Sequence, residues 1–464
     1  MPIALRKGKR SCVKYPISQF VRTDHLSIQH QSFIAAIDAI KTPTSVQEAL
    51  KDENWVQVMK EEMETYGIDY EETFALIAKM NTVRVIISLI AHFGWNLQQF
   101  DVKNAFLHGE LEEVVYMEIP PRFYSHNEKN MVCRLKKALY GLKQSPRAWF
   151  GRFAQVMISL GYRQSQGDHT LFIKHSPNGK LTLLLVYVDD MIVTSDDEIE
   201  KLNLKEKLAT QFEMKELGKL KYFLGIEVAY SKQGIFISQR KYVLDLFKET
   251  EKLGCKISRV PIEQNHRIGC EESPIIEKSQ YHRLVGKLIY LFHTRPDISH
   301  VVSVVSQFMH DPRERHLQAV ERILQYLKAS PGKGLLFRKE GMLSMEIYTD
   351  ADYAGSVMDR ISNLGYCIFL RGNLVTWRSN KQNMVARSSV EAEFRAMAQV
   401  KYDRTKHIEI DRHFIKEKLD SGLIVTAHVP TGLQVADVFT KGLPTTRFQE
   451  LNGKLGMIDI RLPT

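Results

Sequence analysis

Cysteine is scarce in this sequence and never closely spaced. The five cysteines among 464 residues form no CxxC pair and no Cys/His cluster at zinc spacing, which fits a reducing compartment. The N-terminus MPIALRKGKR has no apolar signal core, and the longest apolar run, Leu183 to Val188, is too short to span a bilayer. We therefore expect a cytoplasmic or nuclear protein that is neither secreted nor inserted in a membrane. The basic stretch at 6–10 is either a nuclear signal or a solvated tail.

Internal repeats and low-complexity tracts are also missing. With 44% hydrophobic and 25% charged residues, the composition is that of a globular protein, which disfavours extended disorder and fibrous structure. The length suggests about three units, at ~150 residues per domain. The excess of 64 Lys and Arg over 54 Asp and Glu gives a net charge of +10, which suits a polyanionic partner. Many basic proteins bind no nucleic acid, so charge alone does not identify that partner.

Four segments of the chain differ in pattern, and together they predict a multidomain protein of mixed α+β or α/β class. Residues 1–44 are polar, basic and punctuated by proline, as in a linker. Residues 45–265 mix helical and strand patterns, residues 266–340 carry helical patterns that are unbroken over 279–330, and strands return in 341–464. The predicted strands are Trp95–Phe100, Leu181–Val188, Met191–Thr194, Tyr222–Ala229, Ile235–Ser238, Met345–Thr349, Leu364–Leu370 and Leu374–Trp377.

The pair Asp189-Asp190 lies between two apolar strand patterns, at 181–188 and 191–194. Adjacent side chains on a strand face opposite ways, so a tight turn is needed for both acids to serve one site. A hairpin tip held by buried strands would place them rigidly, as a two-metal site requires. Asp101, at the end of the predicted strand Trp95–Phe100, is the candidate for a further ligand. The alternative is a surface hairpin in which Asp-Asp only forms the turn.

The motifs YVDD at 187–190 and DVKNAFLHG at 101–109 resemble the reverse transcriptase of copia-type LTR retrotransposons. YGIDYEETFALIAKM, VCRLKKALYGLKQSPRAWF, LGKLKYFLGIEV and RTKHIEIDRHFIKEKL match stretches of that family's Pol polyprotein in the same order, so the resemblance covers the chain from about residue 45. It implies a right-hand polymerase with fingers and palm in 45–265, a helical thumb or connection in 266–340, and a truncated ribonuclease H-like domain in 341–464.

The resemblance also implies roles for individual residues. Asp101, Asp189 and Asp190 would be catalytic and would bind Mg²⁺ or Mn²⁺, with an RNA template, a DNA primer, a deoxynucleoside triphosphate and an RNA–DNA hybrid as partners. Phe106 would exclude a 2′-hydroxyl and Gln144 would line the nucleotide pocket; their alternatives are core packing and an ordinary turn residue. The residues expected to meet nucleic-acid phosphates, or else to form an exposed basic helix face, are Lys136, Lys137, Lys143 and Arg147.

In the C-terminal segment, Ile347-Tyr-Thr-Asp350-Ala-Asp352 resembles the first strand of a ribonuclease H, with Asp350 as the best fit for a metal-binding acid. A helix opens at Ser388 with a capping-box pattern that accounts for Glu391, and Glu393 would be the second acid. Asp437 would be the last of the set. The alternative for each is an ordinary surface acid.

Two stretches that relatives carry are missing. A basic hairpin of the fingers would lie between Glu64 and Gly67, where its Lys and Arg side chains would neutralise the incoming triphosphate. Loss of each such side chain would slow nucleotide transfer by roughly 10²–10³-fold. Between Val400 and Tyr402, relatives have a strand with the third metal-binding Asp of the ribonuclease H. Gag-type zinc knuckles, a protease triplet and an integrase His/Cys site are also absent. We therefore expect an internally deleted copy, with an impaired polymerase and no ribonuclease H activity. The alternatives are a non-catalytic nucleic-acid-binding remnant or a pseudogene product.

Overall fold

The structure, a computed structural model, describes residues 79–118, 132–142, 144–264, 266, 268–269, 273–339, 344–356, 359–402 and 427–460. The chain divides into two compact units. The first comprises Met1–Leu76 and Gly141–Arg147, and the second comprises Ile77–Tyr140 and Ala148–Thr464. Of the first unit only 141–142 and 144–147 are described, so the predicted linker and the apparent gap at 64–67 lie outside the described residues.

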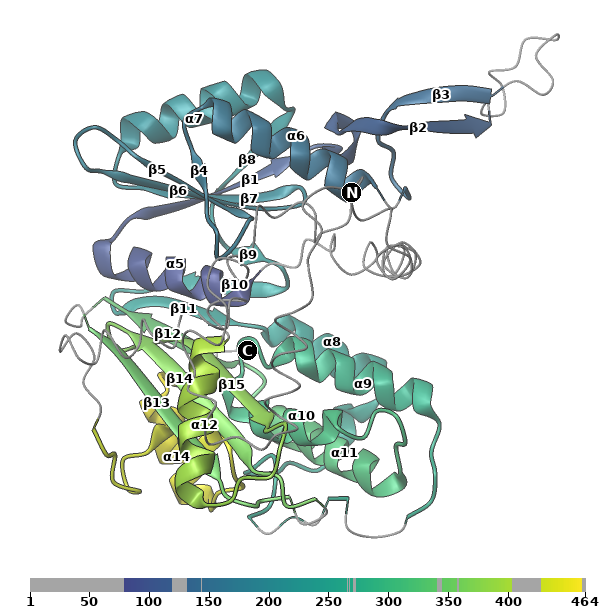
Figure 1. The fold of residues 1–464 in the computed structure, drawn as a ribbon, viewed down its shortest axis with the longest axis vertical. Coiled ribbons are helices and arrows are strands. Elements are labelled where there is room, and N and C mark those ends of the chain that lie inside the picture. Colours follow the sequence, from purple (N-terminus) through teal and green to yellow (C-terminus); the bar gives the residue numbers. More distant parts are fainter. Residues whose placement is uncertain are drawn as a thin grey trace, which may run out of the picture. The chain divides into compact units, whose positions relative to one another are not determined.

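The first sheet of the second unit has six antiparallel strands in the order β4-β5-β6-β7-β1-β8 (Figure 1). Both faces are buried, which explains the nearly continuous apolar pattern of its central strands. Leu184 and Val186 pack with α6 and α7, whereas Leu183 and Leu185 belong to the core that includes α5. The bounds are β1 Asn96–Val102, β4 Arg163–Gln164, β5 Leu171–His175, β6 Leu181–Tyr187, β7 Asp190–Ser195, β8 Met214–Lys219, α5 Met80–Phe93, α6 Ser145–Ser159 and α7 Glu198–Gln211.

The second sheet joins strands from three distant parts of the chain, in the order β16-β12-β11-β10-β9. The predicted strand Tyr222–Ala229 is wrong as one piece, because Leu224 and Gly225 have φ values of 47° and 72° and form a turn between β9 and β10. The segment 266–340 also ends in a strand that the helical pattern did not predict. The bounds are β9 Tyr222–Phe223, β10 Ile226–Tyr230, β11 Gly234–Ser238, β12 Lys333–Arg338 and β16 Met457–Asp459.

The helical pattern over 279–330 is confirmed. Pro296 opens a short 3-10 helix that leads into α10, because proline favours the first position of a helix. The helices are α8 Arg240–Glu249, α9 Lys278–Leu291, α10 Ser299–Ser306 and α11 Glu314–Ala329, with 3-10 turns η4 Lys252–Gly254 and η5 Pro296–Ile298. No helix that the structure describes combines the length and the apolar character that a membrane crossing requires.

The third sheet has the order β13-β14-β15 and confirms the three strands predicted after residue 341. The predicted cap is confirmed in part: the hydroxyl of Ser388 accepts from the N–H of Glu391 at 3.1 Å, but Glu391 accepts from Arg387 and not from Ser388. The bounds are β13 Met345–Asp352, β14 Asn363–Leu370, β15 Asn373–Lys381, α12 Ser389–Tyr402, η6 Val435–Phe439 and α14 Thr445–Lys454.

A separate two-stranded ribbon pairs β2 Glu110–Glu118 with β3 Val132–Lys137, after the 3-10 helix η3 Ala105–His108.

A buried arginine on α5 binds the third sheet to the rest of the second unit. Arg84 Nε donates to the carbonyl of Val375 at 2.8 Å, and Nη1 donates to the carbonyl of His293 at 2.6 Å. Its guanidinium lies 3.8 Å from the centre of the Trp377 ring. Burial lowers the pKa of Arg84 to about 9. The apolar core that includes α5 also continues into the third sheet, so the C-terminal segment shares a core with the preceding segments.

Candidate active site

The YVDD residues form the tip of the β6–β7 hairpin. Tyr187 pairs with Asp190, so Val188 and Asp189 are the two turn residues. Val188 has a φ of 52°, a left-handed conformation that is strained for a β-branched residue. The buried indole of Trp149 donates to the carbonyl of Val188 at 2.7 Å. This contact from α6 helps to hold the strained turn in place.

Asp101 lies directly opposite Asp190 in the β1–β7 pairing. The strand runs on to Val102 instead of ending at Phe100, and the N–H of Val102 donates to the carbonyl of Asp189 at 2.8 Å. Directly paired residues project from the same face of a sheet. Because Met191, the next residue on β7, packs with α6 and α7, the two acids project from the opposite face.

The three acids repel one another electrostatically. Asp190 is half-buried, and burial raises the pKa of its carboxyl, as do the negative charges of Asp189 and Asp101. The Nε2 of Gln99 donates to Asp190 Oδ1 at 3.1 Å and opposes this rise. Burial and the charge of Asp189 also raise the pKa of Tyr187. A cation bound among these carboxylates would relieve the repulsion.

The chemistry of this donor set fits a hard divalent cation such as Mg²⁺, which prefers carboxylate oxygens. Among the described residues, however, no three His, Cys, Asp or Glu side chains stand in an arrangement that could hold a metal ion. The assignment of Asp101, Asp189 and Asp190 as metal ligands therefore remains a prediction.

A second group of acids gathers at the edge of the third sheet. Asp350 comes from β13, Glu393 from α12 and Asp437 from η6, although α12 and η6 lie far apart in the sequence. Glu393 Oε1 accepts from the N–H of Ala351, next to Asp350, at 3.1 Å. Lys441 Nζ lies 3.3 Å from Asp350 Oδ2 and 2.8 Å from Asp437 Oδ1. The structure thus brings the three predicted acids together and adds a lysine.

Burial raises the pKa of Glu393 and of Asp437 and is the largest cause of both shifts. The charge of Asp350 raises both further, and Lys441 opposes the rise. The pKa of Asp352 is also raised by burial and by Asp350. For Lys441, burial would lower the pKa, but the charges of Asp350 and Asp437 outweigh it and the pKa is raised.

The position between Asp350 and Asp437 therefore already holds a positive charge. A Mg²⁺ ion bound to both oxygens would need to approach each within ~2.0–2.1 Å, where the ammonium group of Lys441 would repel it. As they stand, these residues do not fit a divalent cation between Asp350 and Asp437.

Comparison with known proteins identifies the family. A family model described as reverse transcriptase (RNA-dependent DNA polymerase) matches residues 48–264. The retrovirus-related Pol polyprotein from transposon RE1 of Arabidopsis thaliana is 37% identical over 84% of this chain and 29% of its own length. That from transposon TNT 1-94 of Nicotiana tabacum is 33% identical over 84% of this chain and 33% of its own length. A transposon Ty5-1 protein of Saccharomyces cerevisiae is 31% identical, and the chain covers 96% of it.

The chain belongs to the copia-type retrotransposon Pol polyprotein family. It spans about a third of the length of the RE1 and TNT 1-94 polyproteins that it matches. The resemblance read from the YVDD and DVKNAFLHG motifs is thereby confirmed, whereas the roles of individual residues remain predictions.

The predicted nucleotide-binding residues fall in different units. Phe106 lies in η3, half-buried, and its ring centre is 4.8 Å from that of Tyr140, so it packs partly against the core. Gln144 belongs to the first unit and lies directly before α6. Arg147, one of the predicted phosphate-binding residues, also belongs to the first unit and lies in the first turn of α6. Their positions as partners of the carboxylates therefore remain predictions.

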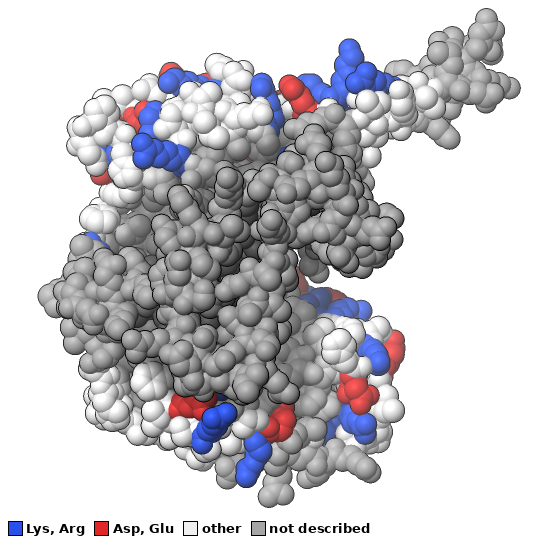
Figure 2. Space-filling model, in the orientation of Figure 1, with Lys and Arg blue, Asp and Glu red and all other residues white. Residues whose placement is uncertain are grey.

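The predicted phosphate-binding lysines lie on a strand. Lys136 and Lys137 are exposed at the end of β3, so the alternative of a basic helix face is wrong for them. Arg134 is exposed on the same strand, and Figure 2 shows blue side chains on the β2–β3 hairpin at the upper right of the view. Lys143 lies outside the described residues.

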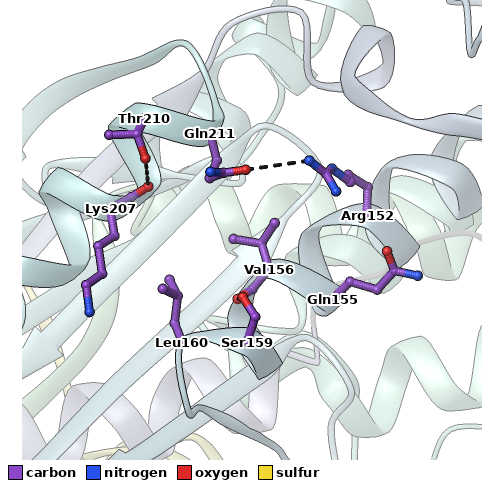
Figure 3. Close-up of a pocket in the computed structure, with 8 residues that line it drawn as sticks. All are labelled: Arg152, Gln155, Val156, Ser159, Leu160, Lys207, Thr210 and Gln211. Carbon is purple, nitrogen blue, oxygen red and sulfur yellow. Dashed lines mark hydrogen bonds between the residues drawn. The ribbon is translucent and has the colours of Figure 1, made fainter.

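A hollow of about 490 Å³ lies between α6 and α7 (Figure 3). Arg152 Nη2 donates to Gln211 Oε1 across it at 3.5 Å, and Val156 and Leu160 are apolar parts of its lining. Both helices cover the face of the first sheet opposite to that of Asp101 and Asp190. The hollow is therefore separate from the carboxylates.

Three neighbours of the acids were not predicted from the sequence. Gln99 was recognisable in part, because it lies two residues before Asp101 and so on the same face of β1. Trp149 gave no such signal, because it contacts the Val188 carbonyl from 39 residues away. Lys441 was recognisable only in part: it follows Asp437, with which it pairs, by four residues, but its contact with Asp350 does not follow from local periodicity.

Proposed function

We propose that this chain is an RNA-directed DNA polymerase whose reactive carboxylates are Asp101, Asp189 and Asp190. One observation carries the proposal: Asp101 is the direct cross-strand partner of Asp190, beside a tight turn that contains Asp189, in a member of a reverse transcriptase family. The first sheet with α6 and α7 would be the palm, and α9 to α11 would form the thumb and connection.

In the proposed mechanism the chain supplies oxygen ligands in a fixed arrangement. When bound, Mg²⁺ ions would activate the primer 3′-hydroxyl and stabilise charge on the α-phosphate and the leaving pyrophosphate. Asp101 and Asp190 would hold them from one face of the sheet, and Asp189 from the turn. The buried contact from Trp149 to Val188 limits movement of that turn, which preorganises the ligands before substrate arrives.

Primer extension on an RNA template, with Mg²⁺ or Mn²⁺, tests the proposal. We expect extension by the parent chain and none by the Asp189→Asn, Asp190→Asn variant. Asp245→Asn is the matched control, because Asp245 is an exposed acid on α8 whose ion pair with Lys248 is long, at 3.8 Å. Extension equal in the parent and the double variant would overturn the proposal, as would equal loss in the control.

The basic β3 surface favours a second candidate function, a nucleic-acid-binding remnant without catalysis. Arg134, Lys136 and Lys137 are all exposed on β3, with Arg134 and Lys136 on the same face of the strand, and cations on a strand edge can contact phosphates. Binding to an RNA–DNA duplex that weakens steeply with salt, without any primer extension, would support this candidate. Affinity independent of salt would contradict it, because phosphate contacts release counterions.

For the C-terminal segment we propose that no ribonuclease H activity remains, because Lys441 lies between Asp350 and Asp437. RNA in an RNA–DNA hybrid should stay intact in the presence of Mg²⁺. Cleavage that disappears in an Asp350→Asn variant would contradict the proposal.

A further inference from the structure

A lysine, Lys441, lies among the carboxylates of the second acidic cluster, which consists of Asp350, Glu393 and Asp437. A two-metal enzyme would use such carboxylates to bind metal ions. Asp350 is 7% exposed and Asp437 is 4% exposed, so both carboxyl groups are largely removed from water. Buried carboxylates are strongly destabilising unless they are paired and hydrogen-bonded. Lys441 Nζ contacts an oxygen of each, at 3.3 Å and 2.8 Å, and the hydroxyl of Thr440 donates to Asp350.

The position of Lys441 is built into the fold. The backbone at 439–440 packs closely against β14 at Gly365. A Cβ atom added to residue 365 would lie only 2.6 Å from the Cβ of Phe439. Gly365 is also the direct cross-strand partner of Asp350. The missing side chain thus lets the end of η6 lie beside Asp350, and this brings the following Lys441 to the acids.

A side-chain amide anchors the other end of η6. Gln434 Nε2 donates to the carbonyl of Thr349 at 2.9 Å, next to Asp350, and Gln434 Oε1 accepts from the N–H of Ala436 at 3.2 Å. With both ends of this short helix held on the third sheet, the backbone of Lys441 is fixed beside the acids, while its side chain is 40% exposed and ends at their oxygens.

We propose that Lys441 is the resident cation of this cluster and that a divalent ion can bind Asp350 and Asp437 only if Lys441 is displaced. The ammonium group is tethered to the chain, so it competes for the same oxygens at a high effective concentration. It supplies part of the counter-charge that a metal would otherwise supply. The repulsion between Asp350 and Asp437 is therefore partly offset from within the chain, and the cluster folds without a divalent ion.

The test uses the full chain with Asp189→Asn and Asp190→Asn, so that the proposed polymerase site contributes little to metal binding. In this background, bound Mn²⁺ is measured from the loss of the free-ion electron paramagnetic resonance signal, and stability from urea denaturation with and without Mn²⁺. The variants are Lys441→Met, which removes the charge, and Lys441→Arg, which keeps it. The outcome does not depend on whether the polymerase proposal holds.

We expect Lys441→Met to have a lower urea midpoint without metal and to bind Mn²⁺ about tenfold or more tightly than the parent, because two buried carboxylates lose their counter-ion. Added Mn²⁺ should restore its midpoint, whereas Lys441→Arg should behave like the parent. Equal Mn²⁺ affinity in the parent and Lys441→Met, or an unchanged midpoint in Lys441→Met, would overturn the proposal.

A second variant covers the case in which Lys441→Met yields no folded protein. Adding Asp350→Asn to Lys441→Met removes one of the two unpaired charges. Recovery of folded protein supports the proposal, and failure to recover contradicts it.

Discussion

The buried ion pair between Arg295 and Asp297 offers a sharp test of how this protein is stabilised. Both side chains are at most 1% exposed, and Asp297 accepts from Arg295 Nε at 3.0 Å and from Nη2 at 2.8 Å. The hydroxyl of Tyr326 also donates to Asp297, and Lys333 Nζ lies 3.9 Å away. Arg295 further donates to the carbonyl of Ser330 at 2.9 Å. Asp297 therefore balances the charge of a buried arginine, with further partners from α11 and β12.

Asp297→Asn keeps the shape of the side chain but removes its charge. Arg295 is then left buried and uncompensated, and removal of one partner of such a pair costs about 3–5 kcal/mol of unfolding free energy. Asp311→Asn is the matched control. The Asp311–Arg313 pair has the same residue types and sequence separation, a distance of 3.2 Å, and side chains 60% and 36% exposed. An exposed pair of this kind contributes about 0–1 kcal/mol.

Urea denaturation, followed by circular dichroism and by tryptophan fluorescence, measures both variants. Burial alone would raise the pKa of Asp297, but the charge and hydrogen bonds of Arg295 outweigh it, and the pKa is lowered. The contribution of Asp297 to stability is therefore present at neutral pH and is lost as the pH falls through and below the ordinary Asp range, near pH ~4. Equal midpoint shifts for Asp297→Asn and Asp311→Asn at pH 7 would refute this reasoning.

Three further predictions concern other buried contacts. Trp149→Phe removes the donor to the Val188 carbonyl, so the unfolding free energy in urea should fall by about 1–3 kcal/mol, together with any primer extension. Gly365→Ala places a Cβ 2.6 Å from that of Phe439 and should lower the unfolding free energy in urea by about 1–3 kcal/mol; an unchanged unfolding free energy would count against the close packing. Burial lowers the pKa of His300 to about 3, so below pH ~6.5 only the unfolded chain gains this proton, and stability should fall by about 1.4 kcal/mol per pH unit. A pH profile of the urea midpoint that is identical in His300→Asn would contradict this last prediction.

Several features of the protein could be predicted from local sequence. The apolar runs on either side of Asp189-Asp190 predict the β6–β7 hairpin, because a strand buried on both faces needs continuous apolar side chains and polar residues between such strands favour a turn. The turn itself lies one residue earlier than predicted, at Val188 and Asp189, and Asp190 belongs to β7. The helices over 279–330 follow from apolar residues at a spacing of three to four, and η5 from Pro296 at its first position. The motifs around these acids were also enough to recognise the family.

The tertiary structure alone decided which distant residues meet. Asp101 became the partner of Asp190 because β1 extends to Val102 and pairs with β7, which the pattern of β1 by itself does not specify. β12 and β16 complete a sheet begun more than ~100 residues earlier in the chain. The meeting of Lys441 with Asp350 depends on a glycine opposite that acid in a neighbouring strand. Periodicity reports which face of an element is buried, but the choice of partner depends on register and side-chain volume across segments that are remote in sequence.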